Sequence, residues 1–148
     1  MIHIRPADPD HLHLFPGIAN GQGNFNDAGA LDTLKRQIET GVAVSLVTED
    51  GEIVCIMGVA KISHGVGDGW FRASPLLRKH LRDVQKAVPR VIAIATVANE
   101  FHRVHTLVKT GYTAGRKFVE FLGFEYEATL EKIGPEAGDY DIFIWKGV

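Results

Sequence analysis

The sequence predicts one α/β domain in which helices and strands alternate, and three stretches carry that prediction. Residues 104–124 have the pattern of a strand, a turn and a helix. Residues 77–98 place apolar side chains on a single helical face for about six turns. Residues 42–62 contain two β-rich runs separated by an Asp-Gly pair, which is typical of a tight hairpin.

Length and composition fit a single domain. The chain has 148 residues, 45% of them hydrophobic, and a chain of this size buries about two-thirds of its unfolded surface. A formal net charge of -2 gives no general attraction to nucleic acid, which needs a concentrated basic face. No apolar stretch approaches the roughly 20 residues that span a bilayer, and the N-terminus lacks a signal-peptide pattern. We therefore expect a cytoplasmic protein with neither nucleic acid nor membrane as a partner.

The N-terminal residues predict a strand followed by a short helix. Apolar and polar side chains alternate over residues 2–5, and Pro6 stops the run. Asp8 or Asp10 is suited to cap a helix that ends after Phe15, where a Pro-Gly pair follows.

A loop and a second helix are expected before the central strands. Residues 19–30 are rich in glycine and asparagine, which favours a loop. Residues 31–39 have amphipathic helical spacing, and Gly41 can cap that helix.

The central strands are separated by glycine-rich turns. Residues 42–47 and 53–62 should pair antiparallel through the Asp-Gly turn. Glycines in residues 65–69 predict a second turn, which delivers residues 70–73 as a further strand.

The long helix contains a proline. Apolar residues recur at positions 77, 81, 84, 88, 91, 95 and 98. Pro89 removes a backbone donor and crowds the preceding turn at a cost of about 3 kcal/mol, so we expect a kink or a break near Ala87.

The last third of the chain predicts strand, helix and hairpin. Gly123 can supply the left-handed residue of a helix C-terminus, with Phe124 folding back as the hydrophobic contact. Residues 125–133 and 140–145 then predict two strands joined by a turn rich in glycine.

Two motifs resemble those of a known superfamily. The run FVEFLGFE, at residues 118–125, resembles the FYEKLGFE signature of GNAT-type N-acetyltransferases. The run GDGWF, at residues 67–71, with Ser74 after it, is similar to a motif of phage-encoded GNAT-fold proteins, among them an internal virion (core) protein of short-tailed phages. The resemblance covers about residues 53–146.

The resemblance implies a fold and two alternative functions. The fold is a mixed, mostly antiparallel sheet flanked by helices, with the strands at 70–73 and 104–108 splayed around an acyl-pantetheine arm. The first function is an acyl-CoA-dependent N-acetyltransferase that passes the acetyl group of acetyl-CoA to an amine. The alternative is an inactive phage protein that binds virion proteins during morphogenesis. A homodimer is left open.

The implied cofactor loop lacks its glycines. GNAT enzymes place a glycine-rich loop where this chain has Ser74 to His80, without a glycine. Side-chain charge can replace lost amide contacts to a diphosphate, and the candidates are Ser74, Arg78, Lys79, His80 and Arg82. Alternatively, these charges are a solvated helix face.

The implied catalytic residues also depart from the family pattern. Acetyl transfer needs a base for the ammonium proton and an acid for the leaving thiolate. The usual tyrosine position is Val119, which cannot titrate, so Tyr112 is the candidate acid, or else it only lines the cofactor groove. Asp68 is the candidate base, or else a turn aspartate between two glycines.

The remaining reactive side chains predict no further site. Cys55 lies within a strand and should behave as a small hydrophobe. The histidine pairs at 11 and 13 and at 102 and 105 lack metal-site spacing, so no metal is expected.

Overall fold

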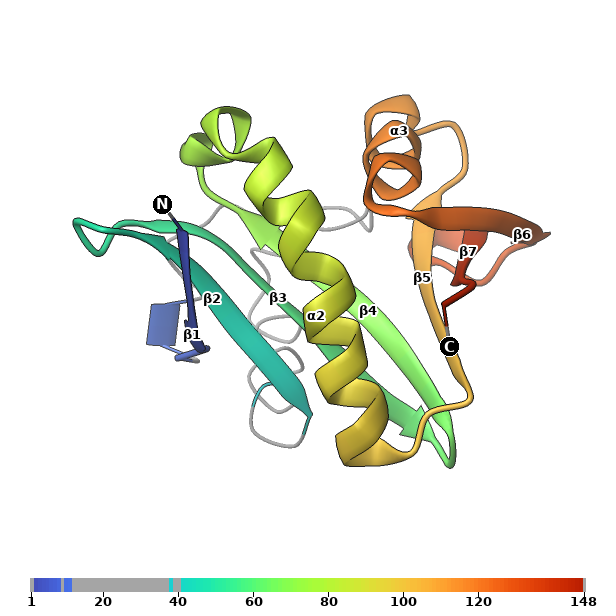
Figure 1. The fold of residues 1–148 in the computed structure, drawn as a ribbon. Coiled ribbons are helices and arrows are strands. Elements are labelled where there is room, and N and C mark those ends of the chain that lie inside the picture. Colours follow the sequence, from blue (N-terminus) through green and yellow to red (C-terminus); the bar gives the residue numbers. More distant parts are fainter. Residues whose placement is uncertain (1, 9, 12–37, 39–40, 148) are drawn as a thin grey trace.

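The computed structural model describes residues 2–8, 10–11, 38 and 41–147 (Figure 1). The expected helices and loop between residues 12 and 37 lie outside this part. Within it, one sheet has the strand order β1-β2-β3-β4-β5-β7-β6. Neighbouring strands are antiparallel except β4 and β5, which are parallel, so the predicted mixed, mostly antiparallel sheet is confirmed. The strands are β1 (Ile2–Pro6), β2 (Val42–Thr48), β3 (Ile53–Ser63), β4 (Val66–Ala73), β5 (Arg103–Lys109), β6 (Phe124–Leu130) and β7 (Tyr140–Trp145).

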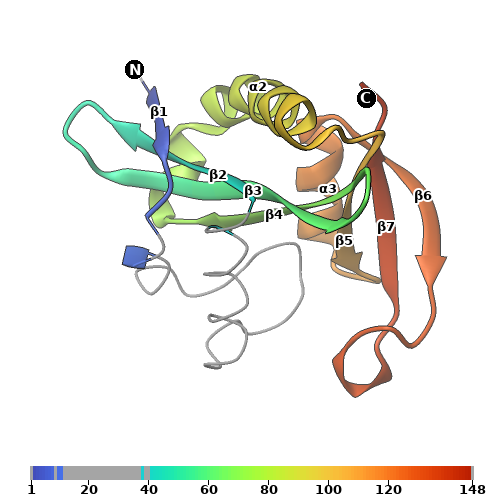
Figure 2. The same ribbon diagram turned by 90° about the horizontal axis from the view of Figure 1, so that it is seen from below.

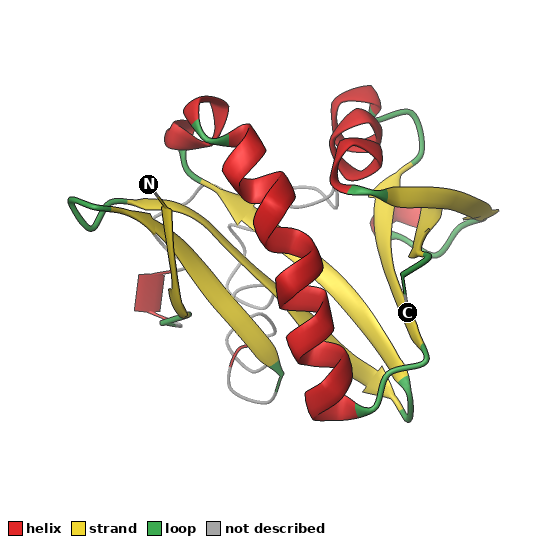
Figure 3. Cartoon of the chain, in the orientation of Figure 1, coloured by secondary structure: helices red, strands yellow, loops and turns green. Residues whose placement is uncertain are grey.

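Two α-helices pack on the same face of the sheet. The long helix α2 (Leu81–Asn99) crosses it beside β2 and β3, and α3 (Thr113–Leu122) lies beside β5 and β6 (Figures 1 and 3). Their buried side chains join one hydrophobic cluster with those of β2, β3 and β5. A short 3-10 helix, η2 (Pro75–Lys79), precedes α2, and another, η3 (Pro135–Ala137), precedes β7. No helix of the described residues is long and apolar enough to cross a bilayer.

The predicted face of the long helix is confirmed in its middle. Val84, Val88, Val91 and Ala95 are buried against the sheet. The expected break near Ala87 is wrong, because α2 is continuous through Pro89. Pro89 lies on the solvent side of the helix, where water can satisfy the carbonyl that its missing N–H leaves unpaired. The interruption comes earlier, at His80, between η2 and α2.

The second glycine-rich turn is shorter than predicted. Gly65 has the left-handed φ of 76°, but the strand β4 already begins at Val66, so Asp68 is a strand residue and not a turn aspartate. Gly67 serves close packing, since a Cβ there would lie 2.5 Å from Cγ1 of Val59 and 2.9 Å from Cε2 of Phe101. As a strand residue, Asp68 lies opposite His105 of β5.

The parallel strands β4 and β5 separate after a short contact. Their pairing runs from Val66 with Arg103 to Asp68 with His105 and stops there. Beyond this point the ribbons diverge towards the ends that lead into η2 and α3 (Figure 1). At the point of divergence the Thr106 hydroxyl donates a hydrogen bond of 2.8 Å to the Gly69 carbonyl. The predicted parallel and splayed strands are therefore confirmed.

The C-terminal elements follow the prediction closely. Gly123 ends α3 with a φ of 113°, as its place after the last apolar turn indicates. The strands β6 and β7 form the expected antiparallel hairpin, and β6 ends at Leu130, earlier than expected. Seen from below, β6 and β7 continue the sheet beyond β5 on the side away from β1 (Figure 2).

Candidate active site

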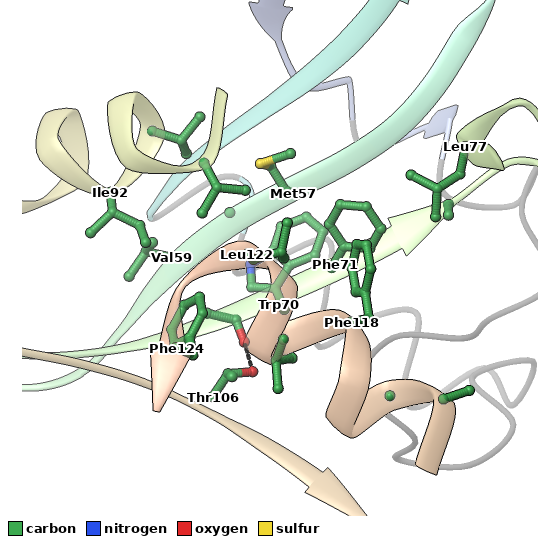
Figure 4. Close-up of a pocket in the computed structure, with 18 of the residues that line it drawn as sticks. Met57, Val59, Trp70, Phe71, Leu77, Ile92, Thr106, Phe118, Leu122 and Phe124 are labelled. Atoms are coloured by element: carbon green, nitrogen blue, oxygen red, sulfur yellow. Dashed lines mark hydrogen bonds between the residues drawn. The ribbon is translucent and has the colours of Figure 1, made fainter. Parts of the chain in front are cut away.

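A cavity of about 490 Å³ lies between the two helices and the splayed strands. Figure 4 shows its side chains converging from the sheet and from α3. Phe71 and Phe118 are in contact in its wall, with ring centroids 4.9 Å apart and the ring planes tilted by 55°. The apolar lining comes from Met57 and Val59 of β3, Phe71 and Ala73 of β4, Leu77 of η2, Val88, Val91 and Ile92 of α2, Val104 of β5, Phe118, Val119 and Leu122 of α3, and Phe124 of β6.

The basic turn borders this cavity at one end. Ser74 and Arg78 belong to its lining, whereas Lys79, His80 and Arg82 do not. The Ser74 hydroxyl donates to the Val54 carbonyl at 3.0 Å and accepts from the Leu76 amide at 3.2 Å, so it fixes the turn to β3.

The turn leaves the first amides of α2 available. The N-cap residue His80 makes no side-chain capping bond, and its Nδ1 lies 3.4 Å from the Asp83 carboxylate. The N–H groups of the first helical turn have no partner within the helix, and the helix dipole favours an anion beside them. Of the five residues predicted to bind the cofactor, Ser74 and Arg78 line the cavity, Lys79 ends η2, His80 is the N-cap of α2, and Arg82 lies in the first turn of α2.

Tyr112 and Val119 both line the cavity from α3. Tyr112 is the N-cap residue of the helix, and its ring packs over Gly115, where a Cβ would lie 2.7 Å from Tyr112 Cδ2. Val119 is 5% exposed and is part of the hydrophobic core. The family's tyrosine position therefore holds a packing residue here, and Tyr112 is the phenol that the structure places at the cavity.

Asp68 lies on the opposite face of β4 from the helices. Side chains alternate along a strand, and Phe71 packs in the helix-side core while Trp70 joins the other cluster with Ile56 and Ala60. Asp68 shares the face of Trp70 and is not part of the cavity lining. The structure does not bring Asp68 and Tyr112 together, because β4 separates them.

The Asp68 carboxyl is buried and its protonation is shifted. Burial raises the pKa of Asp68 to about 7, since removal from water penalises the charged form. Its Oδ1 atom is buried without a hydrogen-bond partner in the described part of the chain. The nearest basic atom is Nε2 of His105, 4.0 Å from Oδ1.

Sequence analysis did not identify His105 or Arg103 as part of this group. Arg103 Nε donates to His105 Nδ1 at 3.0 Å, and Nη1 and Nη2 of the same guanidinium donate to the two oxygens of the Glu127 carboxylate. Burial, followed by the charge of Arg103, lowers the pKa of His105, while Glu127 acts weakly in the other direction. Arg103 in turn lowers the pKa of Glu127. The register of β4 with β5 brings Asp68 to His105, and the pairing of β5 and β6 with β7 brings Glu127 to Arg103. No local sequence signal indicates these registers.

Cys55 behaves as predicted for a small hydrophobe. It is fully buried in the helix-side cluster, and burial raises the pKa of its thiol to about 12. A thiolate nucleophile is therefore excluded at this position near neutral pH.

Comparison with known proteins supports the architecture. No protein-family model and no curated protein matches the sequence. Among solved structures, a protein provisionally assigned as a phosphinothricin N-acetyltransferase aligns with a TM-score of 0.70 and 12% identity, over 98% of both chains. A variant of the spermidine N-acetyltransferase from Vibrio cholerae aligns with a TM-score of 0.68 and 11% identity, over 97% of this chain and 92% of that one.

A third solved structure is similar in fold at comparably low sequence identity. An acetyltransferase of the GNAT family from Streptococcus pneumoniae aligns with a TM-score of 0.65 and 15% identity, over 98% of this chain and 99% of that one. Identities this low establish the fold alone. The described part of the chain therefore has the fold of GNAT-type proteins.

Proposed function

We propose that the protein is an acyl-CoA-dependent N-acetyltransferase that passes an acetyl group from acetyl-CoA to an amine. One observation carries the proposal. The parallel strands β4 and β5 part after Asp68 and His105, and an apolar cavity of about 490 Å³ opens over the gap, between α2 and α3. A narrow apolar slot along a free strand edge suits a pantetheine arm, which is extended and carries amides.

The free edge of β4 supplies polar contacts for that arm. In a strand, the N–H and C=O of one residue point to the same side. The Gly69 carbonyl faces β5, where Thr106 binds it, so the N–H and C=O of Phe71 also face the gap. Phe71 lines the cavity, and its N–H is the proposed donor to the arm or to the thioester oxygen as negative charge develops there.

The diphosphate of the donor is assigned to the turn between β4 and α2. Without glycines, the turn cannot wrap the phosphates closely, but the first amides of α2 and the side chains of Arg78, Lys79, His80 and Arg82 supply positive potential. Arg78 is the candidate for direct contact because it also lines the cavity.

The two catalytic groups act from opposite faces of the sheet. The amine is proposed to approach from the face of Asp68, and the thioester from the cavity, so the two meet in the gap between the strands. Asp68 takes the ammonium proton, the amine nitrogen then bonds to the carbonyl carbon, and the carbon–sulfur bond breaks. Tyr112 gives its proton to the departing thiolate, and the acylated nitrogen, which still carries one proton too many, returns that proton to the Tyr112 phenolate. A carboxyl with a pKa of about 7 is well matched to a base near neutral pH.

The GDGWF motif supports a phage-type origin, in which case the protein acts in the host cytoplasm. The morphogenetic alternative draws on a different observation: Val119 is a core residue and the turn at Ser74 has no glycine, so neither family feature is retained. The two functions differ in whether donor binding is retained. The alternative requires a surface for virion proteins and no donor.

Titration with acetyl-CoA separates the two functions. Calorimetry should give a single site, and a ligand held at a hundred times its Kd should stabilise the fold by about 2.7 kcal/mol. Desulfo-CoA should also bind, since it retains the phosphates and the arm. The absence of heat and of a thermal shift at millimolar acetyl-CoA would overturn the acetyltransferase proposal.

A further inference from the structure

Four side chains form a connected row across β4, β5 and β6. The row consists of Asp68, His105, Arg103 and Glu127, and we call it the carboxyl–imidazole row. His105 Nε2 lies 4.0 Å from Asp68 Oδ1, and Arg103 Nε lies 3.0 Å from His105 Nδ1. Arg103 then binds Glu127 in a two-point contact that includes an N–O distance of 2.9 Å.

Arg103 fixes which nitrogen of His105 carries the proton. A guanidinium group has only donors and keeps its charge in proteins. The Nδ1 atom that receives its N–H must therefore offer a lone pair, and the ring proton is on Nε2. Glu127 holds the guanidinium in place through the planar fork geometry. The consequence is an N–H group aimed from His105 towards Asp68.

Burial, followed by the charge of Arg103, favours the neutral imidazole of His105. Burial and Arg103 lower the pKa of His105, and burial raises the pKa of Asp68 to about 7. Asp68 therefore ionises in a pH range where His105 is already neutral. Outside the row, Lys146 after β7 acts on Glu127 and lowers its pKa. The β7 residue opposite His105 is the apolar Ile144.

We propose that His105 is the positioning residue for Asp68, donating its Nε2–H to Oδ1 of the ionised carboxylate and leaving Oδ2 to take the proton from the amine. This inference rests on the proposed acetyl transfer. The distance of 4.0 Å exceeds that of a hydrogen bond, which is about 2.7–3.2 Å. We expect it to shorten when Asp68 ionises, as contacts of catalytic groups often do when the reacting state forms.

Nuclear magnetic resonance of the free protein tests the geometry without any substrate. Nitrogen-15 shifts of the His105 ring should show a neutral imidazole with its proton on Nε2 at pH 7. Carbon-13 shifts of the Asp68 carboxyl, identified by its loss in Asp68→Asn, should give its pKa. A proton on Nδ1, or an imidazolium at pH 7, would overturn the proposal.

Two substitutions of His105 separate a donor from a packing residue. His105→Leu removes the donor, and the Asp68 pKa should rise by about one to two units, the equivalent of one hydrogen bond to a charged group. His105→Gln keeps an N–H within similar reach, so its Asp68 pKa should stay close to that of the parent protein. Equal pKa values in the Leu and Gln variants would contradict the assignment.

A matched control addresses the loss of an arginine. Arg103→Ala frees the His105 tautomer, so the Asp68 pKa should rise as in His105→Leu. Arg116→Ala removes a similar arginine–glutamate pair on α3, where Arg116 Nε lies 2.9 Å from Glu120 Oε1, and should leave the Asp68 pKa unaltered. An equal rise in both variants would identify a general charge effect and overturn the specific role of Arg103.

The pH dependence of acetyl transfer completes the test. In His105→Leu the rising limb of kcat/KM against pH should move by the same one to two units to higher pH, while a purely structural defect would lower the rate equally at every pH. If the carboxyl shift is seen but the parent protein transfers no acetyl group, the contact stands and the proposed function fails. If transfer occurs and its pH profile does not move, the positioning role fails.

Discussion

The two charged regions of the proposed site are built differently. The turn that would meet the diphosphate carries its charges in the open: Arg78, Lys79 and Arg82 are all exposed. The carboxyl–imidazole row buries one end in the sheet, where the side chains of Asp68 and His105 are 19% and 11% exposed, and Arg103 and Glu127 at its other end are 27% and 37% exposed. Exposed charges attract a ligand over a distance and are screened by salt, whereas buried ones act at one position and shift one another's pKa. Loss of one exposed charge should therefore be tolerated, and loss of a buried one should not.

The largest loss of activity should come from substitution of the buried carboxyl of Asp68. Asp68→Asn removes the proposed base while keeping its size, and kcat/KM should fall about 10²–10⁴-fold, the usual contribution of a positioned base. The calorimetric affinity for acetyl-CoA should stay the same because Asp68 lies on the other face of β4. Asp50→Asn in the exposed turn between β2 and β3 is the matched control. A rate loss below about threefold would show that Asp68 is not the base.

The same carboxyl should make stability depend on pH. Its pKa is higher in the folded protein than in the unfolded chain, from 3.8 to about 7, so the folded state binds more protons between these values. The contribution of Asp68 to the free energy of unfolding is therefore largest below about pH 4 and falls as pH rises from about 4 to 7. The fall should approach about 4 kcal/mol, at 1.36 kcal/mol per pKa unit. Urea unfolding of the parent and of Asp68→Asn across this range measures it, and parallel curves for the two proteins would contradict the raised pKa.

A smaller effect is expected from the exposed turn. Arg78→Ala should weaken acetyl-CoA binding by about 1.5–3 kcal/mol through loss of one charge-assisted contact, and should change the stability by less than about 0.5 kcal/mol. Arg90→Ala, on the solvent side of α2, is the control and should bind normally. If both variants bind as the parent does, the basic turn is ordinary solvated surface.

The smallest principal change in free energy is expected at Thr106, where β4 and β5 diverge. Thr106→Val keeps the shape of the side chain and removes its hydrogen bond to the Gly69 carbonyl. Thermal unfolding should show a loss of about 0.5–1.5 kcal/mol, the net value of one hydrogen bond at a half-buried carbonyl. Because this bond lies at the divergence of β4 and β5, the affinity for acetyl-CoA should change more than in Arg90→Ala. Unaltered stability and affinity would show that Thr106 has no part in holding the gap.

Sequence reasoning succeeded where a feature is local. The helical face through Val84 and Val91 depends on spacing alone, and the cap at Gly123 depends on one residue's freedom at positive φ. The splayed strands and the place of the cofactor turn came from the resemblance and not from periodicity.

Features that depend on the register of distant strands were missed. Asp68 was identified as a candidate base, but its alternative as a turn residue remained until β4 was seen to begin at Val66. The segment between Asp68 and His105 includes the whole of α2, and no short-range pattern specifies that those two side chains are opposite. The break predicted from Pro89 was wrong because the destabilisation of a helix by proline depends on whether the unpaired carbonyl contacts water. That depends on which side of the helix faces solvent, so it requires knowing the orientation of the helix.

The glycines on either side of Asp68 share one face of β4, and that face is crowded at Gly67 and open at Gly69. Gly67 has no room for a side chain, because Val59 and Phe101 occupy the space. At Gly69 a Cβ would meet its nearest atom at 3.6 Å, an ordinary contact, and it would project into the cavity. Position 67 is therefore fixed by packing, while a methyl group at position 69 would narrow the slot without disturbing the core. Under the proposed function, a substitution at position 69 would change the length of acyl group admitted, independently of the chemistry at position 68.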